Sequence, residues 1–139
     1  MKKYALVTGG SRGIGRAICL KLAELGYPVI INYKSNKEEA THTSDLILNK
    51  GGEAELLQFD VRSREDAEKA LDNWAVSHQD SYIACLVNNA GIRKDNLLVF
   101  MNDDEWKDVL ETNLFSQFYI TRKFSISVQQ CVNGMKAAG

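Results

Sequence analysis

A glycine-rich segment at residues 8–15, TGGSRGIG, has the composition of a phosphate-binding turn. It follows the apolar run 4–7 and precedes a stretch in which apolar residues recur at helical spacing from Ile14 to Leu25. Glycines permit positive φ and let a ligand approach the backbone closely. The start of a helix presents unpaired N–H groups and the positive end of its dipole to a phosphate. The segment therefore predicts a phosphate site between a strand and a helix.

Two common nucleotide-binding loops do not fit this segment. The spacing G-x-G-x-x-G is absent. The spacing of a P-loop nearly fits from Gly10 to Gly15, but Arg16 and Ala17 stand where a Lys and a Ser or Thr would hold phosphates and Mg²⁺. An ATPase or a kinase is therefore excluded, and the pattern that remains is T-G-x-x-x-G-x-G.

The elements that position this turn alternate between short apolar runs and longer amphipathic stretches. The runs 4–7, 29–31, 55–59 and 82–87 predict four strands, and helices are expected from about residues 14, 38, 63, 102 and 113. This alternation predicts βαβ units and a parallel sheet. The run 82–87 is apolar throughout, which favours a strand covered by helices on both faces. His42 and His78 fall on polar helical stretches and are expected in solvent.

Composition excludes several classes of protein. The 139 residues suit one domain, and 17 basic against 18 acidic residues leave no electrostatic footprint for nucleic acid or an anionic membrane. No apolar run approaches the roughly 20 residues of a transmembrane helix. Cys19, Cys85 and Cys131 are too widely spaced for a metal or redox pair. A single cytoplasmic domain without metal, membrane or nucleic-acid partner is expected.

Four ordered motifs resemble those of the short-chain dehydrogenase/reductase family. The turn at 8–15 is followed by Asp60-Val61 after the third strand, by N-N-A-G at 88–91 and by Asn113 within E-T-N. The match covers residues 3 to about 124. Segments 91–98 and 101–106 resemble the branch of 3-oxoacyl-acyl-carrier-protein reductases of fatty acid biosynthesis. The resemblance implies a Rossmann-type, doubly wound parallel α/β sheet with strand order 3-2-1-4-5-6-7.

The resemblance also implies the residues that hold a nicotinamide dinucleotide. The glycine turn would hold the pyrophosphate, and Arg12, Lys34 and Ser35 would hold a 2′-phosphate. Asp60 and Val61 would hold the adenine, and segment 88–91 the adenosine ribose and the path towards the nicotinamide. The full set is Gly9, Gly10, Ser11, Arg12, Gly13, Ile14, Gly15, Tyr33, Lys34, Ser35, Asp60, Val61, Asn88, Asn89, Ala90 and Gly91.

The end of the second strand favours NADP(H) over NAD(H). An acidic residue there bonds the ribose 2′-hydroxyl in NAD-binding folds. The strand instead ends in Asn32-Tyr33-Lys34-Ser35, so no carboxylate would repel a 2′-phosphate. Arg12 and Lys34 could reach that phosphate, and Ser35 is placed beside it by the resemblance. A charged hydrogen bond contributes about 1.5–3 kcal/mol, or about ten- to hundredfold in preference.

The family's reaction uses a Ser, a Tyr-x-x-x-Lys pair and an Asn, and the resemblance assigns only the Asn, Asn113, to this chain. The implied reaction is NADPH-dependent reduction of a 3-oxoacyl thioester, and the 139 residues alone are expected to be inactive. Tyr33–Lys37 and Tyr119–Lys123 match the spacing. The first falls in the cofactor loop and the second on a helical packing face, so neither is expected to be catalytic. A non-catalytic NADP(H)-binding module or an inactive truncated product is the alternative.

Residues 125–139 depart from the family, and an insertion, a frame-shifted tail or a divergent helix would each explain this. The sequence therefore predicts a single incomplete domain over 1–139, interrupted after the fourth strand and fifth helix. The fourth strand would then be an open edge. The resemblance implies a homotetramer built through the fifth and following helices, an assembly not expected for a chain of this length. Substrate identity, acyl chain length and activity are not determined by the sequence.

Overall fold

The computed structural model describes residues 1–92 and 97–138. Residues 93–96, part of the segment that resembles the acyl-carrier-protein reductase branch, lie outside the described residues. The elements are β1 (Lys2–Val7), α1 (Gly13–Glu24), β2 (Val29–Tyr33), α2 (Lys37–Asn49), β3 (Ala54–Gln58), α3 (Arg64–Ser77), β4 (Ser81–Val87), α4 (Asp103–Leu110), η1 (Glu111–Phe115), which is a π-helical turn, and α5 (Ser116–Ala138).

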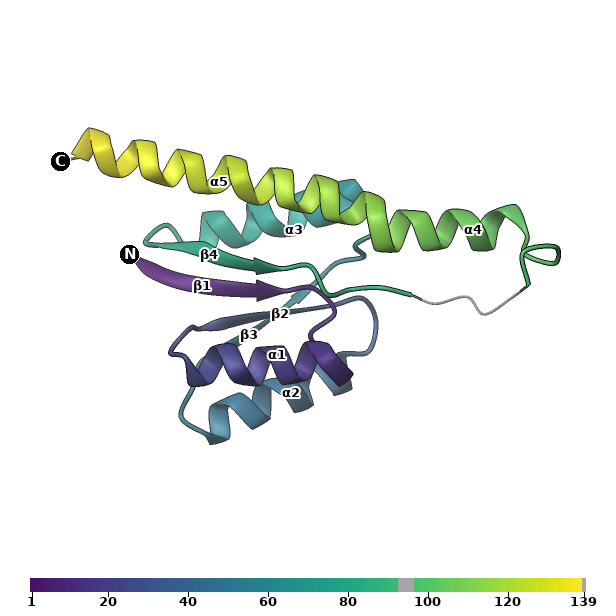
Figure 1. Cartoon of the computed structure of the whole chain (residues 1–139). Coiled ribbons are helices and arrows are strands. Elements are labelled where there is room, and N and C mark those ends of the chain that lie inside the picture. Colours follow the sequence, from purple (N-terminus) through teal and green to yellow (C-terminus); the bar gives the residue numbers. More distant parts are fainter. Residues whose placement is uncertain (93–96, 139) are drawn as a thin grey trace.

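The four strands form one parallel sheet in the order β3-β2-β1-β4. Helices α1 and α2 cover one face, and α3 and α5 cover the other (Figure 1). Because all strands are parallel, their carboxyl ends lie at the same edge of the sheet, where the loops to the helices begin. The predicted doubly wound α/β fold and the first four positions of the strand order are confirmed.

The central strands are buried because helices cover both of their faces. All five residues of β2, and Tyr4 to Val7 of β1, are buried. On the α1–α2 side the core includes Val7, Cys19 and Ile47. On the opposite side Tyr4 packs edge-to-face on Trp74 of α3, with ring centroids 5.1 Å apart.

The structure corrects the two ends of the apolar face predicted for the first helix, whereas Ile18 and Leu22 of that face pack on the core. Ile14 and Leu25 are 75% and 64% exposed. The residues that α1 buries are Gly15 and Cys19. Ile14 lies in the first turn of α1 and Leu25 follows its last residue, so both lie at the ends of the helix, whereas the buried pair lies within it.

The structure also corrects the prediction that His78 is exposed to solvent. Its side chain is 24% exposed, and its ring stacks on Trp74 with centroids 4.4 Å apart. Its Nε2 lies 3.1 Å from Glu55 Oε1, while Nδ1 lies 2.9 Å from the Trp74 carbonyl oxygen. The end of α3 packs beside β3, which the polar sequence around His78 does not reveal.

Strand β4 pairs only with β1 among the strands of the described residues. All seven of its residues are half-buried. The expected open edge is therefore present in the part of the chain described, while Val87 packs on the core under α1 and α2 and Leu86 packs on the core of the opposite face. A strand without a second neighbour leaves the backbone N–H and C=O groups along one edge unpaired.

The divergent residues after 124 continue helix α5 as far as Ala138. The third possibility raised by the sequence, a divergent helix, describes their local structure. Helix α5 packs on β4 and runs beside α3, with Lys123 Nζ 2.5 Å from Asp72 Oδ1. Within residues 1–92 and 97–138, none of the helices combines the length and the apolar character needed to cross a membrane.

Candidate functional site

The glycine turn has the geometry of an anion-binding loop. Gly9 and Gly13 have φ values of 65° and 56°, a region that favours glycine. Arg12 precedes α1 in an extended conformation and makes no side-chain capping hydrogen bond, and the first turn of α1 contains no acidic residue. The N–H groups that open α1 therefore lack both a side-chain cap and a neighbouring negative charge, as a phosphate-binding helix requires.

Gly15 allows α1 to lie directly against the turn. A Cβ atom at this position would be 2.0 Å from the Gly9 carbonyl oxygen and 2.6 Å from Asn89 Nδ2. Asn89 Nδ2 also donates to the carbonyl oxygens of Thr8 and Gly9, both at 3.1 Å. The turn after β1 and the segment after β4 thus form one packed unit that tolerates no side chain at position 15.

Thr8 joins the same two segments from the other side. Its Oγ1 accepts hydrogen bonds from the backbone N–H groups of Asn89 and Ala90, both at 3.0 Å, and lies 3.3 Å from the Val87 carbonyl oxygen. Thr8 is 2% exposed. The N-N-A-G motif predicted from sequence is therefore held in place by the first residue of the T-G-x-x-x-G-x-G motif.

Asn32 connects the ends of three strands, a role that the sequence analysis did not assign. Its Oδ1 accepts from Gly9 N at 3.1 Å, and its Nδ2 donates to the carbonyl oxygens of Phe59 at 3.1 Å and Leu57 at 3.3 Å. The side chain is buried and fully engaged with backbone groups. The sequence feature that could have indicated this role is the presence of a polar residue in a strand that begins with three apolar residues.

A cleft of about 800 Å³ opens above these strand ends. It is lined by Gly9, Ser11, Arg12, Gly13, Ile14, Gly15, Asn32, Tyr33, Lys34, Ser35, Asn36, Phe59, Asp60, Val61, Arg62, Asn89, Ala90, Gly91, Ile92, Asp108 and Thr112. Of the residues expected to hold the dinucleotide, all except Gly10 and Asn88 are in this set. The lining residues not assigned from sequence are Asn32, Asn36, Phe59, Arg62, Ile92, Asp108 and Thr112.

Three assigned residues do not line the cleft. A Cβ at Gly10 would meet Cys19 Sγ at 2.9 Å, so the glycine is needed for packing against α1. Asn88 Nδ2 donates to Thr121 Oγ1 of α5 at 3.0 Å. Asn113 binds the backbone of Ile92 twice: its Oδ1 accepts from Ile92 N and its Nδ2 donates to Ile92 O, both at 2.8 Å.

The two hydrogen bonds of Asn113 fix the segment that leaves β4. Asn113 sits in the π-helical turn η1, and such turns are frequent at functional sites. Its Oδ1 is 3.1 Å from where a Cβ on Gly91 would be, so the segment passes close to η1. In this structure the side chain of Asn113 positions backbone at the cleft wall.

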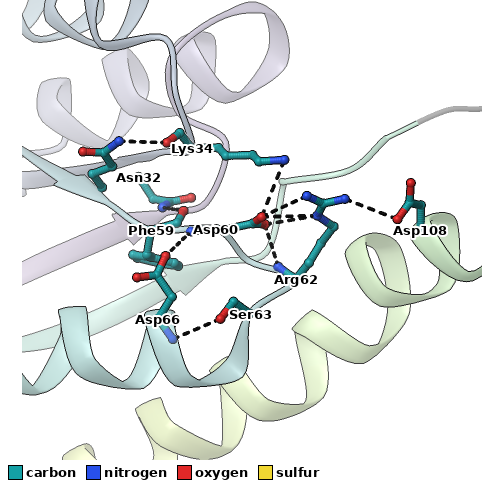
Figure 2. A network of polar contacts seen from close by, with 9 residues as sticks. Asn32, Lys34, Phe59, Asp60, Arg62, Ser63, Asp66 and Asp108 are labelled. Atoms are coloured by element: carbon teal, nitrogen blue, oxygen red, sulfur yellow. Dashed lines mark hydrogen bonds and ion pairs between the residues drawn. The ribbon is translucent and has the colours of Figure 1, made fainter.

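A charged network lies at the end of the cleft where β2 and β3 finish (Figure 2). Asp60 Oδ2 lies 3.0 Å from a terminal nitrogen of Arg62 and 3.5 Å from Lys34 Nζ. The other terminal nitrogen of Arg62 lies 3.3 Å from Asp108 Oδ1 on α4. Asp60 N in turn donates to Asp66 Oδ2 at 2.8 Å. The network links the ends of two strands to α3 and α4.

Asp60 remains ionised in this network. Burial alone would raise the pKa of its carboxyl group. Hydrogen bonds from the side chain and backbone of Arg62, and the positive charges of Arg62 and Lys34, outweigh burial and lower the pKa below its ordinary value of 3.8. The cleft therefore contains a carboxylate whose charge is balanced locally.

The two Tyr-x-x-x-Lys matches have no catalytic geometry. Tyr119 is 8% exposed, its hydroxyl has no hydrogen-bond partner among the described residues, and burial, with smaller effects from Asp60 and Glu111, raises its pKa to about 12. Lys123 is engaged with Asp72. Tyr33 is a buried β2 residue within the core under α1 and α2.

A twisted parallel sheet with a glycine turn and a helix start at its central crossover is the architecture of a dinucleotide-binding domain. The model of the short chain dehydrogenase family matches residues 3–135. The chain belongs to that family.

Similar curated proteins include 3-oxoacyl-acyl-carrier-protein reductases. The protein from Staphylococcus epidermidis is 45% identical over 123 residues, which are 88% of this chain and 50% of the relative. The protein from Pseudomonas aeruginosa is 42% identical over 120 residues, 86% of this chain and 47% of the relative. The chain thus spans about half the length of the curated relatives it matches.

Solved structures with the same fold include other members of the family. A metagenomic short-chain oxidoreductase in complex with NADP is 31% identical with a TM-score of 0.83, covering 91% of this chain and 56% of that one. A dehydrogenase/reductase from Sinorhizobium meliloti is 32% identical with a TM-score of 0.83, covering 91% and 49%.

Proposed function

We propose that this chain is the cofactor-binding part of an NADPH-dependent reductase of 3-oxoacyl thioesters. The observation that carries the proposal is the cleft at the carboxyl ends of β1 to β4, which brings together nearly all the residues assigned to a dinucleotide. The end of β2 in this cleft is followed by Lys34 and Ser35 rather than by an acidic residue.

The residues of the cleft fit a dinucleotide with a 2′-phosphate. The uncapped start of α1 would hold the pyrophosphate, and Gly13 leaves open space, since nothing lies within 4 Å of where its Cβ would be. Arg12 and Lys34 are exposed cations at the cleft wall that would bind the 2′-phosphate. Asp60 and Val61 would contact the adenine. A related short-chain oxidoreductase was solved in complex with NADP, which supports this assignment.

The substrate class follows from the relatives rather than from the cleft. The curated 3-oxoacyl-acyl-carrier-protein reductases share 39–46% identity with this chain over 82–88% of its length. We infer that the whole enzyme acts in the cytoplasm on 3-oxoacyl groups carried by a thioester. The nicotinamide, when bound, supplies the hydride for that reduction. The contribution of the described residues is to bind the dinucleotide, with Asn113 holding the backbone of Ile92 at the cleft wall.

The 139-residue chain is expected to bind the cofactor without turnover. Tyr119 is buried and is not among the residues that line the cleft, and Lys123 is paired with Asp72, so neither is placed to act on a carbonyl there. These positions favour, for the isolated chain, the second candidate function of a non-catalytic NADP(H)-binding module. Oxidation of NADPH by the isolated chain in the presence of an acetoacetyl thioester would contradict this expectation.

Titration calorimetry with NADPH and NADH tests the cofactor. We expect NADPH to bind about ten- to hundredfold more tightly, the size of one charged hydrogen bond to the 2′-phosphate. Lys34→Ala should remove most of that preference and leave NADH binding nearly unchanged. Lys3→Ala is the matched control, because Lys3 is an exposed lysine in β1 at the opposite edge of the sheet. Equal affinities for the two cofactors in the wild-type chain would overturn the assignment of NADPH.

A further inference from the structure

Arg62 lies in the cleft and neutralises the carboxylate next to the 2′-phosphate site. Its Nε is 3.3 Å from each oxygen of Asp60, a terminal nitrogen is 3.0 Å from Oδ2, and its backbone N–H donates to Oδ1 at 2.9 Å. The Asp60 carboxylate is therefore bound by both the side chain and the backbone of Arg62. Figure 2 shows the guanidinium between Asp60 and Asp108, with the Lys34 ammonium above the Asp60 carboxylate in this view.

The position of Asp60 creates an electrostatic conflict for a 2′-phosphate. Lys34 Nζ, the cation expected to bind that phosphate, is 3.5 Å from Asp60 Oδ2. Without a second cation, Asp60 would hold Lys34 and repel the phosphate. Arg62 supplies that second cation through several contacts with Asp60, whereas Lys34 makes one long ion pair and is 57% exposed.

We propose that Arg62 is a positioning residue that determines cofactor selectivity: it compensates the charge of Asp60 and so leaves Lys34 free to bind the 2′-phosphate. The proposal rests on the proposed binding of NADPH and adds a residue outside the segments expected to touch the phosphate. Arg62 acts through Asp60 and need not contact the cofactor.

Asp108 holds the guanidinium in this position. It approaches Arg62 from α4 at 3.3 Å, on the terminal nitrogen that Asp60 does not use. Arg62, Lys34, Asp60 and Asp108 together carry no net charge, and removal of Arg62 would leave the group at −1 beside the phosphate site.

The test is calorimetric titration of the 139-residue chain and its Arg62→Gln variant with NADPH and with NADH. We expect the preference for NADPH to fall about fivefold. This is the size of a salt-screened repulsion between the Asp60 carboxylate and the 2′-phosphate when they lie somewhat further apart than the partners of an ion pair. Affinity for NADH should change little. Arg64→Gln is the matched control, because this substitution removes the same charge only two residues away. Arg64 pairs with Glu68 on the surface of α3.

Two further variants separate charge compensation from a structural role. Arg62→Lys keeps the charge and should retain most of the preference. In an Asp60→Asn background, Arg62→Gln should no longer change the ratio of the two affinities, because no carboxylate remains to be compensated. Circular dichroism establishes that each variant is folded before titration.

The outcomes distinguish the inference from the proposed function. If Arg62→Gln weakens NADPH and NADH equally, or acts the same with and without Asp60, the inference is overturned while NADPH binding stands. If the wild-type chain binds neither cofactor, or binds both equally, the proposed function fails and the inference fails with it. A loss of preference that depends on Asp60 supports both.

Discussion

Replacement of Gly15 by Ala should destabilise the chain although alanine is the better helix former. Position 15 lies in the first turn of α1, and within a helix alanine is favoured over glycine by about 1 kcal/mol. The new Cβ would lie 2.0 Å from the Gly9 carbonyl oxygen and 2.6 Å from Asn89 Nδ2, distances that require backbone to move. Overpacking costs about 1–3 kcal/mol, and loss of the hydrogen bond between Asn89 and Gly9 costs about 0.5–1.5 kcal/mol.

The balance predicts a net loss of about 1–3 kcal/mol in the free energy of unfolding. Because the movement displaces the start of α1, NADPH affinity should fall by tenfold or more. Urea denaturation followed by circular dichroism measures the first effect, and calorimetric titration measures the second.

Gly134→Ala is the matched control. Gly134 lies inside α5, and nothing lies within 4 Å of where its Cβ would be. The same substitution there should stabilise the chain by about 0.5–1 kcal/mol and leave cofactor binding unchanged. If Gly15→Ala were as stable as wild type and bound NADPH equally well, the close approach of α1 to the glycine turn would be refuted.

Three other predictions follow from single contacts. Asn113→Ala removes both hydrogen bonds to the Ile92 backbone and should lower the free energy of unfolding by about 1–3 kcal/mol in urea titrations; no change would show that the Ile92 segment is held by other contacts. Tyr119→Phe removes a buried hydroxyl that has no hydrogen-bond partner among the described residues. The free energy of unfolding should therefore stay the same or rise by up to about 1 kcal/mol, and a clear fall would show that the hydroxyl does have a partner. The lowered pKa of Asp60 means that its ionised form stabilises the fold above pH 3.8 and that this contribution disappears as the pH falls through the lowered pKa. Asp60→Asn should therefore show a smaller loss of stability between about pH 5 and pH 2 than wild type, and parallel curves would argue against the network with Arg62.

Short-range patterns predicted the elements and the phosphate turn. The helix starts expected near residues 63 and 102 are confirmed, and each is capped: Ser63 Oγ accepts from Asp66 N at 3.2 Å, and Asn102 forms a capping box with Glu105. The glycine turn has the positive φ values that its sequence required. These features depend on residues within a few positions of one another, so the printed order of residues determines them.

The partners of individual side chains depended on segments far apart in the chain. Asn32 contacts the turn after β1 and the end of β3, and Arg62 meets Asp108 across 46 residues. His78, at the end of α3, contacts Glu55 of β3 through its Nε2. None of these contacts has a local signature, because each arises only after the parallel sheet has aligned the strand ends.

The sequence by itself therefore determined the family, the order of the elements and most of the residues that line the cleft. Only the tertiary structure decided that Asn113 holds the backbone of Ile92, that Tyr119 is buried away from the cleft, and that Asp60 is neutralised by Arg62. The physical reason is one of range. Backbone conformation and capping follow from neighbouring residues, whereas burial, charge balance and hydrogen-bond partners are set by the packing of elements that the chain brings together only when folded.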